Sequence, residues 1–195
     1  MESDPDRELV RDLSSPSRAR QRRALAALYE RHAEALVNVA WRVAGDWSAA
    51  QDVVQDVFVN LAARIVSFRG ESSLASWLYR ITVNRAIDLK RHEGRRPAAR
   101  LGALPDDVLE GARTPLGGAA VAPEPREASP EAARVRAALD ALSPKLRPIA
   151  VLRYVEGLSY DELAEVLGLS LGTVKSRLNR AQAALAKALG LPPPP

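Results

Sequence analysis

The sequence predicts an all-α protein of two small helical domains joined by a flexible linker. Apolar residues recur at three- and four-residue steps along most of the chain, while strand patterns are weak. Between residues 97 and 130 this periodicity disappears, and the composition becomes rich in Pro, Gly and Ala. With 195 residues, the chain is long enough for a helical core on each side of that stretch.

The first predicted domain spans residues 21–96 and follows an N-terminal tail of residues 1–20. Apolar residues between Leu25 and Val43 fall on one helical face, and Gly45 interrupts the pattern. A second helix is expected next, because Ser48 and Gln51 have the form of a capping box and an apolar stripe follows from Val54 to Ile65.

A third helix is predicted from about Leu74 to Arg91, after a polar loop in which Ser72 or Ser73 is placed as the cap. One side of this helix combines aromatic, basic and amide groups. Such a strip suits unstacked bases, because aromatic rings stack on bases and Arg follows phosphate. A core role for the aromatic residue and a solvated polar face remain alternatives. The strip consists of Trp77, Arg80, Asn84, Asp88 and Arg91.

The second predicted domain covers residues 131–190 and ends in a tail of residues 191–195. Ser129, as a cap, and Pro130, at the first helical position, begin one helix. Another helix is expected after Ser143, where Pro148 predicts a local bend or a late start because it lacks a backbone donor.

A helix-turn-helix is the strongest pattern in the chain. Ser159 and Glu162 form a capping box, Gly168 ends the short helix that follows, and Ser170 is placed to cap the next one. If Val174 faces the core, the opposite side of the second helix presents groups that suit base edges and phosphates. A solvated helix pair is the alternative, but the coincidence of signals favours DNA binding. This recognition strip consists of Lys175, Ser176, Asn179 and Arg180.

Nothing in the sequence indicates an enzyme. Gly-rich phosphate loops, paired acids and bases, and activated serines are missing, and neither His32 nor His92 neighbours a nucleophile. Asp52 and Asp56 lie four residues apart, a spacing that suits a divalent metal, a helix cap or a docking face for a basic partner. A metal is not favoured, because no histidine or third acid lies nearby. We expect no catalytic residue, metal or cofactor.

The composition limits compartment and partners. Lys and Arg number 28 against 24 Asp and Glu, and the net charge of +4 is compatible with nucleic acid. Without cysteine, disulfides and thiolate zinc sites are excluded. No apolar run approaches the roughly 20 residues that span a bilayer, and residues 1–17 lack a signal-peptide pattern. We expect a cytoplasmic protein without membrane insertion.

Five sequence blocks resemble the extracytoplasmic-function sigma factors of RNA polymerase. Residues 52–58 (DVVQDVF), 68–74 (FRGESSL) and 77–84 (WLYRITVN) resemble their σ2 helical bundle. Residues 156–164 (EGLSYDELA) and 172–178 (GTVKSRL) resemble their σ4 helix-turn-helix domain. The blocks occur in the order and at the spacing of that family. Gln51, where an acid is common, and Pro148, in a helix that is usually uninterrupted, depart from its pattern.

The resemblance implies that the first domain binds the polymerase clamp and melts the minus-ten element, while the second reads the minus-thirty-five element and contacts the flap. It also implies an anti-sigma partner. The expected core polymerase contacts are Asp52, Gln55, Asp56 and Phe58. The expected minus-ten contacts are Arg69, Gly70, Glu71, Ser72, Ser73, Leu74, Trp77, Arg80 and Asn84. The expected minus-thirty-five contacts are Thr173, Lys175, Ser176, Asn179 and Arg180.

Two other classes remain open at this point. A helix-turn-helix regulator of the response-regulator type shares the C-terminal pattern, but its N-terminal half would alternate strands and helices around an acidic phosphorylation pocket. A nucleic-acid-processing enzyme that uses Asp52 and Asp56 is the more distant alternative, and it would cleave DNA in the presence of magnesium.

Overall fold

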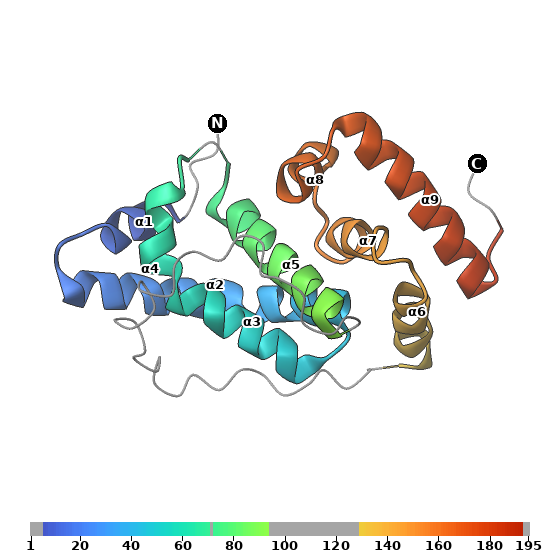
Figure 1. Cartoon of the computed structure of the whole chain (residues 1–195), viewed down its shortest axis with the longest axis horizontal. Helices are drawn as coiled ribbons and strands as arrows, with labels where there is room; N and C mark the ends of the chain where they lie inside the picture. The colour runs from blue at the N-terminus through green and yellow to red at the C-terminus, as the bar shows by residue number, and fades with distance from the viewer. Residues whose placement is uncertain (1–5, 71, 94–128, 193–195) are drawn as a thin grey trace.

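The computed structural model describes residues 6–70, 72–93 and 129–192, and throughout these ranges the regular structure is helical (Figure 1). The expected linker, residues 97–130, lies almost entirely outside them. The helices of the first half are α1 (Arg7–Leu13), α2 (Arg18–Ala44), α3 (Trp47–Val59), α4 (Leu61–Arg64), the 3-10 helix η1 (Ile65–Ser67) and α5 (Leu74–Glu93). Those of the second half are α6 (Pro130–Asp140), α7 (Arg147–Tyr154), α8 (Tyr160–Leu167) and α9 (Leu171–Leu189).

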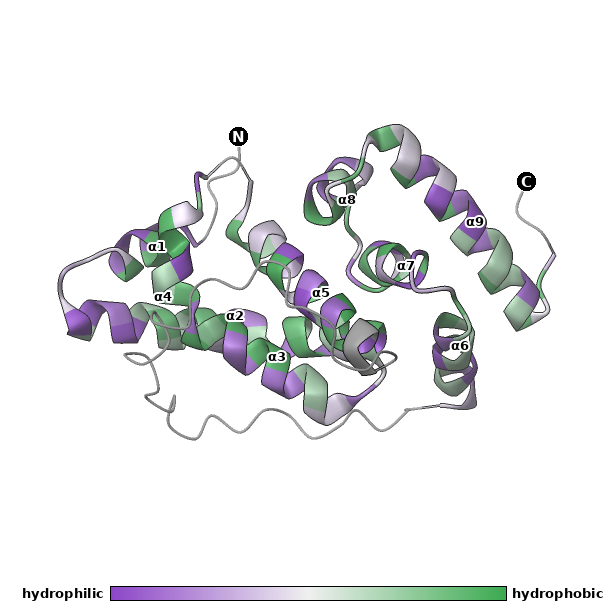
Figure 2. Cartoon of the chain, viewed as in Figure 1, coloured by the Kyte–Doolittle hydropathy of each residue, from purple (hydrophilic) through white to green (hydrophobic). Residues whose placement is uncertain are grey.

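Helix α2 is the centre of the first half. Its first turns are hydrophilic, and its later turns are largely hydrophobic and pack against α3 and α5 (Figures 1 and 2). Gly45 ends the helix with a left-handed φ of 93°, and its N–H donates to the carbonyl oxygen of Trp41. The turn brings Trp47 edge-on to Trp41, with 5.3 Å between ring centroids. The glycine thus allows α3 to fold back along α2.

The expected N-terminal tail contains helix α1, so this part of the prediction is wrong. Asp6 is only 2% exposed, and its carboxylate pairs with Arg31 and His32 on α2. Leu13 at the other end of α1 is buried in the core. A buried carboxylate requires such partners because desolvation penalises an unpaired charge. These partners lie 25 and 26 residues away, beyond the reach of a local pattern.

The second expected helix is shorter than predicted and has a different cap. Asp46, not Ser48, is the N-cap, and its side chain accepts from the backbone N–H of Ala49 at 2.7 Å. The helix ends at Asn60, whose side-chain amide donates to the carbonyl oxygen of Asp56 at 2.8 Å. The backbone N–H of Asn60 donates to the same carbonyl oxygen at 3.2 Å, so the cap residue holds this helix end with two hydrogen bonds. The apolar stripe up to Ile65 therefore continues through α4 and η1.

The second half begins as the sequence indicates. Ser129 caps α6 by accepting from the backbone N–H of Ala132, with Pro130 in the first turn. Pro148 lies in the first turn of α7, where its missing N–H leaves no helical bond unmade. The late start expected at this proline is therefore confirmed. Arg147, which is buried, donates to the carbonyl oxygen of Leu139 at 3.1 Å and ties α7 to the end of α6.

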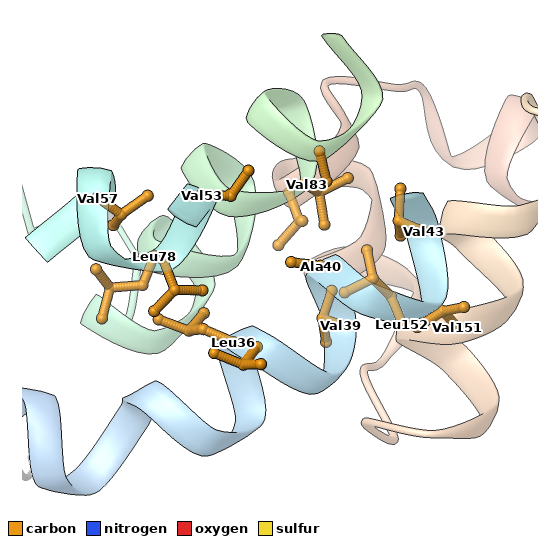
Figure 3. Close-up of a cluster of buried hydrophobic side chains, with 14 of the residues drawn as sticks. Leu36, Val39, Ala40, Val43, Val53, Val57, Leu78, Val83, Val151 and Leu152 are labelled. Carbon is orange, nitrogen blue, oxygen red and sulfur yellow. The ribbon is translucent and has the colours of Figure 1, made fainter. Parts of the chain in front are cut away.

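The two halves share one continuous hydrophobic core. Helix α7 packs against α2, and α8 packs against α5. Figure 3 shows Val39 and Val43 of α2 beside Val151 and Leu152 of α7, and all four side chains are buried. Each half therefore covers apolar surface of the other.

Replacing Phe58 tests the packing of the first half. Phe58 is 0% exposed and meets Tyr29 edge-on, with 5.0 Å between ring centroids. Phe58→Ala should lower the free energy of unfolding by about 3–5 kcal/mol, because truncation of a core aromatic leaves a cavity. Urea denaturation followed by circular dichroism measures the loss. Val66, 84% exposed, is the matched control, and Val66→Ala should change the value by less than about 0.5 kcal/mol. Equal effects of the two substitutions would contradict the packing.

Candidate nucleic-acid interface

Helices α8 and α9 form the helix-turn-helix that the sequence predicts. The capping box is present: Ser159 Oγ accepts from the N–H of Glu162 at 3.3 Å, and the Glu162 carboxylate accepts from the N–H of Ser159 at 2.7 Å. Gly168 ends α8 with a left-handed φ of 62°. Ser170 Oγ then accepts from the N–H of Thr173 at 3.3 Å and starts α9. Side-chain hydrogen bonds thus fix the start of each helix, and the backbone N–H of Gly168 closes the end of α8.

Burial divides α9 into two faces. Val174, Leu178 and Ala181 are buried, which holds the helix in one rotational setting. The recognition strip of Lys175, Ser176, Asn179 and Arg180 is exposed on the other side, and Thr173 is partly covered. The guanidinium of Arg180 donates to the carbonyl oxygen and the hydroxyl of Ser176 at 3.2 and 3.3 Å, so it lies along the helix. The strip offers hydrogen-bond donors and acceptors of the kinds that pair with base edges in a DNA groove.

A basic hollow adjoins this strip. Its walls come from the turn before α7 and from α9, and they carry three cations and three hydroxyl groups. Sequence reasoning missed two of these residues, Lys145 and Arg177. Lys145 comes from a separate segment and meets α9 only in the folded chain. Cations and hydroxyls together are the groups that proteins direct at phosphate oxygens. The lining residues are Ser143, Lys145, Leu146, Thr173, Ser176, Arg177 and Arg180.

The second candidate surface lies on α5 and the loop before it. Ser73 Oγ accepts from the N–H of Ser76 at 3.1 Å, so Ser73 is the cap of this helix. Arg80 and Asn84 are exposed, as the strip requires. Trp77 is partly buried and meets Phe68 edge-on, with 5.7 Å between ring centroids, so one part of the indole is core and another is accessible. Arg80 and Asn84 therefore lie on the same helix as Trp77, whose ring packs against Phe68 before the loop.

The loop itself is divided between exposed and buried residues. Arg69, Gly70 and Ser73 are exposed, and Ser72 is partly exposed, whereas Leu74 is buried in the core. Gly70 has a φ of 69°, a left-handed conformation that side chains other than glycine rarely adopt. Glu71 and the side chain of Arg91 lie outside the described residues. Leu74 thus anchors the loop and presents no surface to a ligand in this conformation.

Helix α3 carries the acidic surface. Asp52, Gln55 and Asp56 are exposed, and the Asp56 carboxylate pairs with Arg85 of α5 at 2.8 Å. Phe58 is fully buried beneath them and supports this face from within. Within residues 6–70, 72–93 and 129–192, no group of three His, Cys, Asp or Glu side chains is arranged to hold a metal ion. The outer side of this helix thus presents two carboxylates and an amide, and one of the carboxylates is paired with Arg85.

Two protein-family models match the chain, one on each half. The model "Sigma-70 region 2" matches residues 28–96, and the model "Sigma-70, region 4" matches residues 132–185. The first match contains the α3 acidic face and the α5 strip, and the second contains the helix-turn-helix. No helix in the described part of the chain has the length and apolar character that crossing a membrane requires.

Curated relatives and solved structures give the same result. The chain is 34% identical to the RNA polymerase sigma-H factor of Pseudomonas aeruginosa over 86% of its own length and 87% of that protein. It is 37% identical to the ECF RNA polymerase sigma-E factor of Escherichia coli K12, over 69% of this chain and 70% of that protein. SigE of Mycolicibacterium smegmatis, another ECF sigma factor, is 35% identical over 80% of the chain, which spans only 57% of that relative.

Two solved structures superimpose on most of the chain. CnrH in complex with the cytosolic domain of CnrY matches with a TM-score of 0.66 and 30% identity, over 95% of this chain and 97% of that one. The sigma factor RpoE of Bartonella quintana, in complex with the anti-sigma factor NepR, matches with a TM-score of 0.58 and 28% identity. The match covers 80% of this chain and 90% of that one.

Proposed function

This chain belongs to the extracytoplasmic-function sigma factors of RNA polymerase, and from that premise we propose how its surfaces divide the work of initiation. The first half, residues 21–96, docks on core polymerase through α3 and captures the opened minus-ten element with α5 and its loop. The second half, residues 131–190, reads the minus-thirty-five element with α9 and contacts the polymerase flap. Residues 97–130 act as the tether between them, so that binding at one site raises the effective concentration at the other.

One observation carries this proposal most directly. The recognition strip of α9 is exposed on a helix whose opposite face is buried, and a capped turn positions the helix. In a helix-turn-helix the second helix enters the major groove with residues of its first turns. Lys175 and Asn179 lie one turn apart and can reach neighbouring base edges. Lys145 and Arg177 in the basic hollow supply phosphate contacts at its border.

The proposed minus-ten surface follows from the chemistry of α5. Asn84 offers both a donor and an acceptor to a base edge, and Arg80 holds phosphate. The exposed backbone at Gly70 permits close approach of an extruded base, and Ser72 and Ser73 supply hydroxyl groups. Stacking on an aromatic ring is worth roughly 1–3 kcal/mol per base, which offsets the few kcal/mol that unstacking costs. The accessible part of Trp77 supplies this platform.

We further propose a regulatory partner and a location. Both solved structures described above are complexes, of RpoE with the anti-sigma factor NepR and of CnrH with the cytosolic domain of CnrY. An anti-sigma protein that covers the promoter-reading or polymerase-binding surfaces fits this chain in the same way. The protein acts in the cytoplasm with the polymerase, and it contributes no catalytic residue of its own.

Run-off transcription tests the proposed function and the docking face together. Full-length chain added to core polymerase should produce transcripts from promoter fragments that core alone does not initiate. Asp52→Arg should raise the chain concentration needed for half-maximal transcription about tenfold, because it places a cation against the basic partner surface. Glu34→Arg reverses the charge of an exposed acid of α2 outside the proposed face and is the control. It should leave the concentration needed for half-maximal transcription unchanged. Without any promoter-specific transcript from the wild type, the proposed function is wrong.

Substitutions on α9 test recognition of the upstream element. Arg180→Ala should lower the dependence of log Kd on log salt by about 1 if the side chain binds phosphate. If it binds a base, discrimination at one position should fall by about 1–3 kcal/mol. Lys187, an exposed cation on the last turns of the same helix, provides the control. Fluorescence anisotropy with promoter and scrambled duplexes measures both quantities, and identical behaviour of Arg180→Ala and Lys187→Ala would exclude the recognition strip.

Permanganate reactivity of unpaired thymines tests strand capture. Asn84→Ala should fold and bind closed promoter like the wild type, because the side chain is exposed, yet the yield of open complex should fall about tenfold. Circular dichroism and a closed-complex binding assay accompany the footprint. Gln182→Ala, an exposed amide outside this surface, is the matched control. Normal opening by Asn84→Ala would remove this residue from the proposed surface.

A further inference from the structure

We propose that a cavity lined by α2, α5, α7, α8 and α9 binds a small amphipathic anion, that is, an anionic head group carried on an aliphatic body. Helices α5 and α8 lie side by side at this cavity (Figure 1). The site goes beyond the proposed function, which assigns no small-molecule ligand to the chain. One consequence of binding, competition with promoter DNA, rests on the proposed function and has its own experiment.

The cavity has the size and the apolar walls of a small-molecule site. Its volume is about 590 Å³, and ligand pockets typically enclose roughly 300–1,000 Å³. Val43 of α2, seen beside α7 in Figure 3, and Pro148 of α7 are buried residues that reach its wall. Ile87 of α5 and Leu167 of α8 also line it and are only partly buried. An aliphatic ligand that covers these side chains removes apolar surface from water on both sides, which favours binding.

Cations accompany these apolar walls. Lys90 of α5, Lys145 of the turn before α7 and Arg177 of α9 line the cavity, and the described residues that line it include no Asp or Glu. A fourth cation, Arg147, is already engaged, because its guanidinium donates to the end of α6 and pairs with Asp140. In the described part of the chain, neither Lys145 nor Arg177 has an acidic partner. An anion in the cavity would therefore supply the charge-assisted hydrogen bonds that these two side chains can form.

The combination of walls and charges selects the chemistry of the ligand. The three cations come from separate segments, so the fold brings like charges around one cavity and raises the positive potential inside it. A cationic amphiphile is repelled by this potential, and a neutral one gains nothing from it. A wholly polar anion gains from the potential but leaves the apolar walls uncovered. Only a ligand with both an anionic head and an aliphatic body uses both features of the cavity.

Two of these cations also belong to the proposed DNA surface. Lys145 and Arg177 line both this cavity and the basic hollow beside the recognition strip of α9. A bound anion neutralises side chains that the proposed function directs at promoter phosphates. Its binding should weaken recognition of the minus-thirty-five element. It should also lower the slope of log affinity against log salt by up to about 2, because each phosphate contact contributes about 0.9.

Titration of the nitrogen-15-labelled full-length chain with octanoate, followed by amide correlation NMR, tests the site. Signals of the lining residues, among them Ile87, Lys145 and Arg177, should shift along one saturable curve. Acetate, which is the head without the body, and octyltrimethylammonium, which is the body with the opposite charge, should bind at least about tenfold more weakly. Equal affinity for octanoate and octyltrimethylammonium, or shifts confined to residues elsewhere in the fold, would overturn the proposal.

Removal of the two cations tests the contact with the head group. The double variant Lys145→Gln, Arg177→Gln should raise the Kd for octanoate about tenfold or more, because the charge-assisted hydrogen bonds are lost. It should leave the Kd for 1-octanol nearly unchanged. Lys187→Gln removes an exposed cation near the end of α9, outside the cavity, and is the matched control for both ligands. Circular dichroism reports whether each variant folds, and octanoate binding by the folded double variant at wild-type affinity would exclude these cations.

Filling the cavity tests the contact with the aliphatic body. Ile87→Trp adds volume at the wall and keeps all the cations, so it should abolish the saturable shifts with octanoate. Val66→Trp, at a position that is 84% exposed and does not line the cavity, is the control and should bind octanoate like the wild type. Wild-type affinity in a folded Ile87→Trp chain would place octanoate outside the cavity.

Fluorescence anisotropy with a minus-thirty-five duplex tests the competition. Octanoate at about ten times its own Kd should raise the apparent Kd for the duplex about tenfold, as mutually exclusive binding requires. Acetate at the same concentration matches the ionic strength and should have no such effect. An unchanged Kd for the duplex at saturating octanoate would overturn the competition. If the chain binds no promoter duplex at all, the proposed function fails, whereas the NMR titration still decides whether the cavity binds the anion.

Discussion

The burial of the C-terminal half of α2 is the constraint on which the rest of the structure depends. Leu36, Val37, Val39, Ala40 and Val43 are all buried, so apolar surface extends around most of the helix in this region. A helix that is apolar on nearly every side must be covered on every side. Helices α3 and α5 cover one part of the circumference and α7 another, and this demand places the two halves against each other.

The same constraint determines where functional side chains can lie. Every helix that contributes to the core has an outer face, and the proposed contacts are found on those faces: the acids of α3, Arg80 and Asn84 of α5, and the strip of α9. Phe58 of α3 and Leu74 of α5 belong to the same helices and are fully buried. They fix the backbone from which the exposed residues project. A loss of activity after their truncation would report unfolding and not a missing contact.

Features encoded by neighbouring residues could be predicted from the sequence. The Ser159 to Glu162 capping box, the stop at Gly168 and the cap at Ser170 each depend on residues at most four positions apart, and all three are present. The exposure of Lys175 and Arg180 followed from the helical period once Val174 was assigned to the core. The late start at Pro148 followed from its missing backbone donor.

Features that depend on distant partners could not be predicted. Helix α1 is held by Asp6 and its partners on α2, and a run of alternating charges contains no sign of that pairing. The end of α3 at Asn60 was missed because the apolar period continues past it into α4. The hydrogen bond from Tyr79 to Glu156 joins segments on opposite sides of the tether. Composition identifies each residue as a donor or acceptor but not the partner that the fold brings to it.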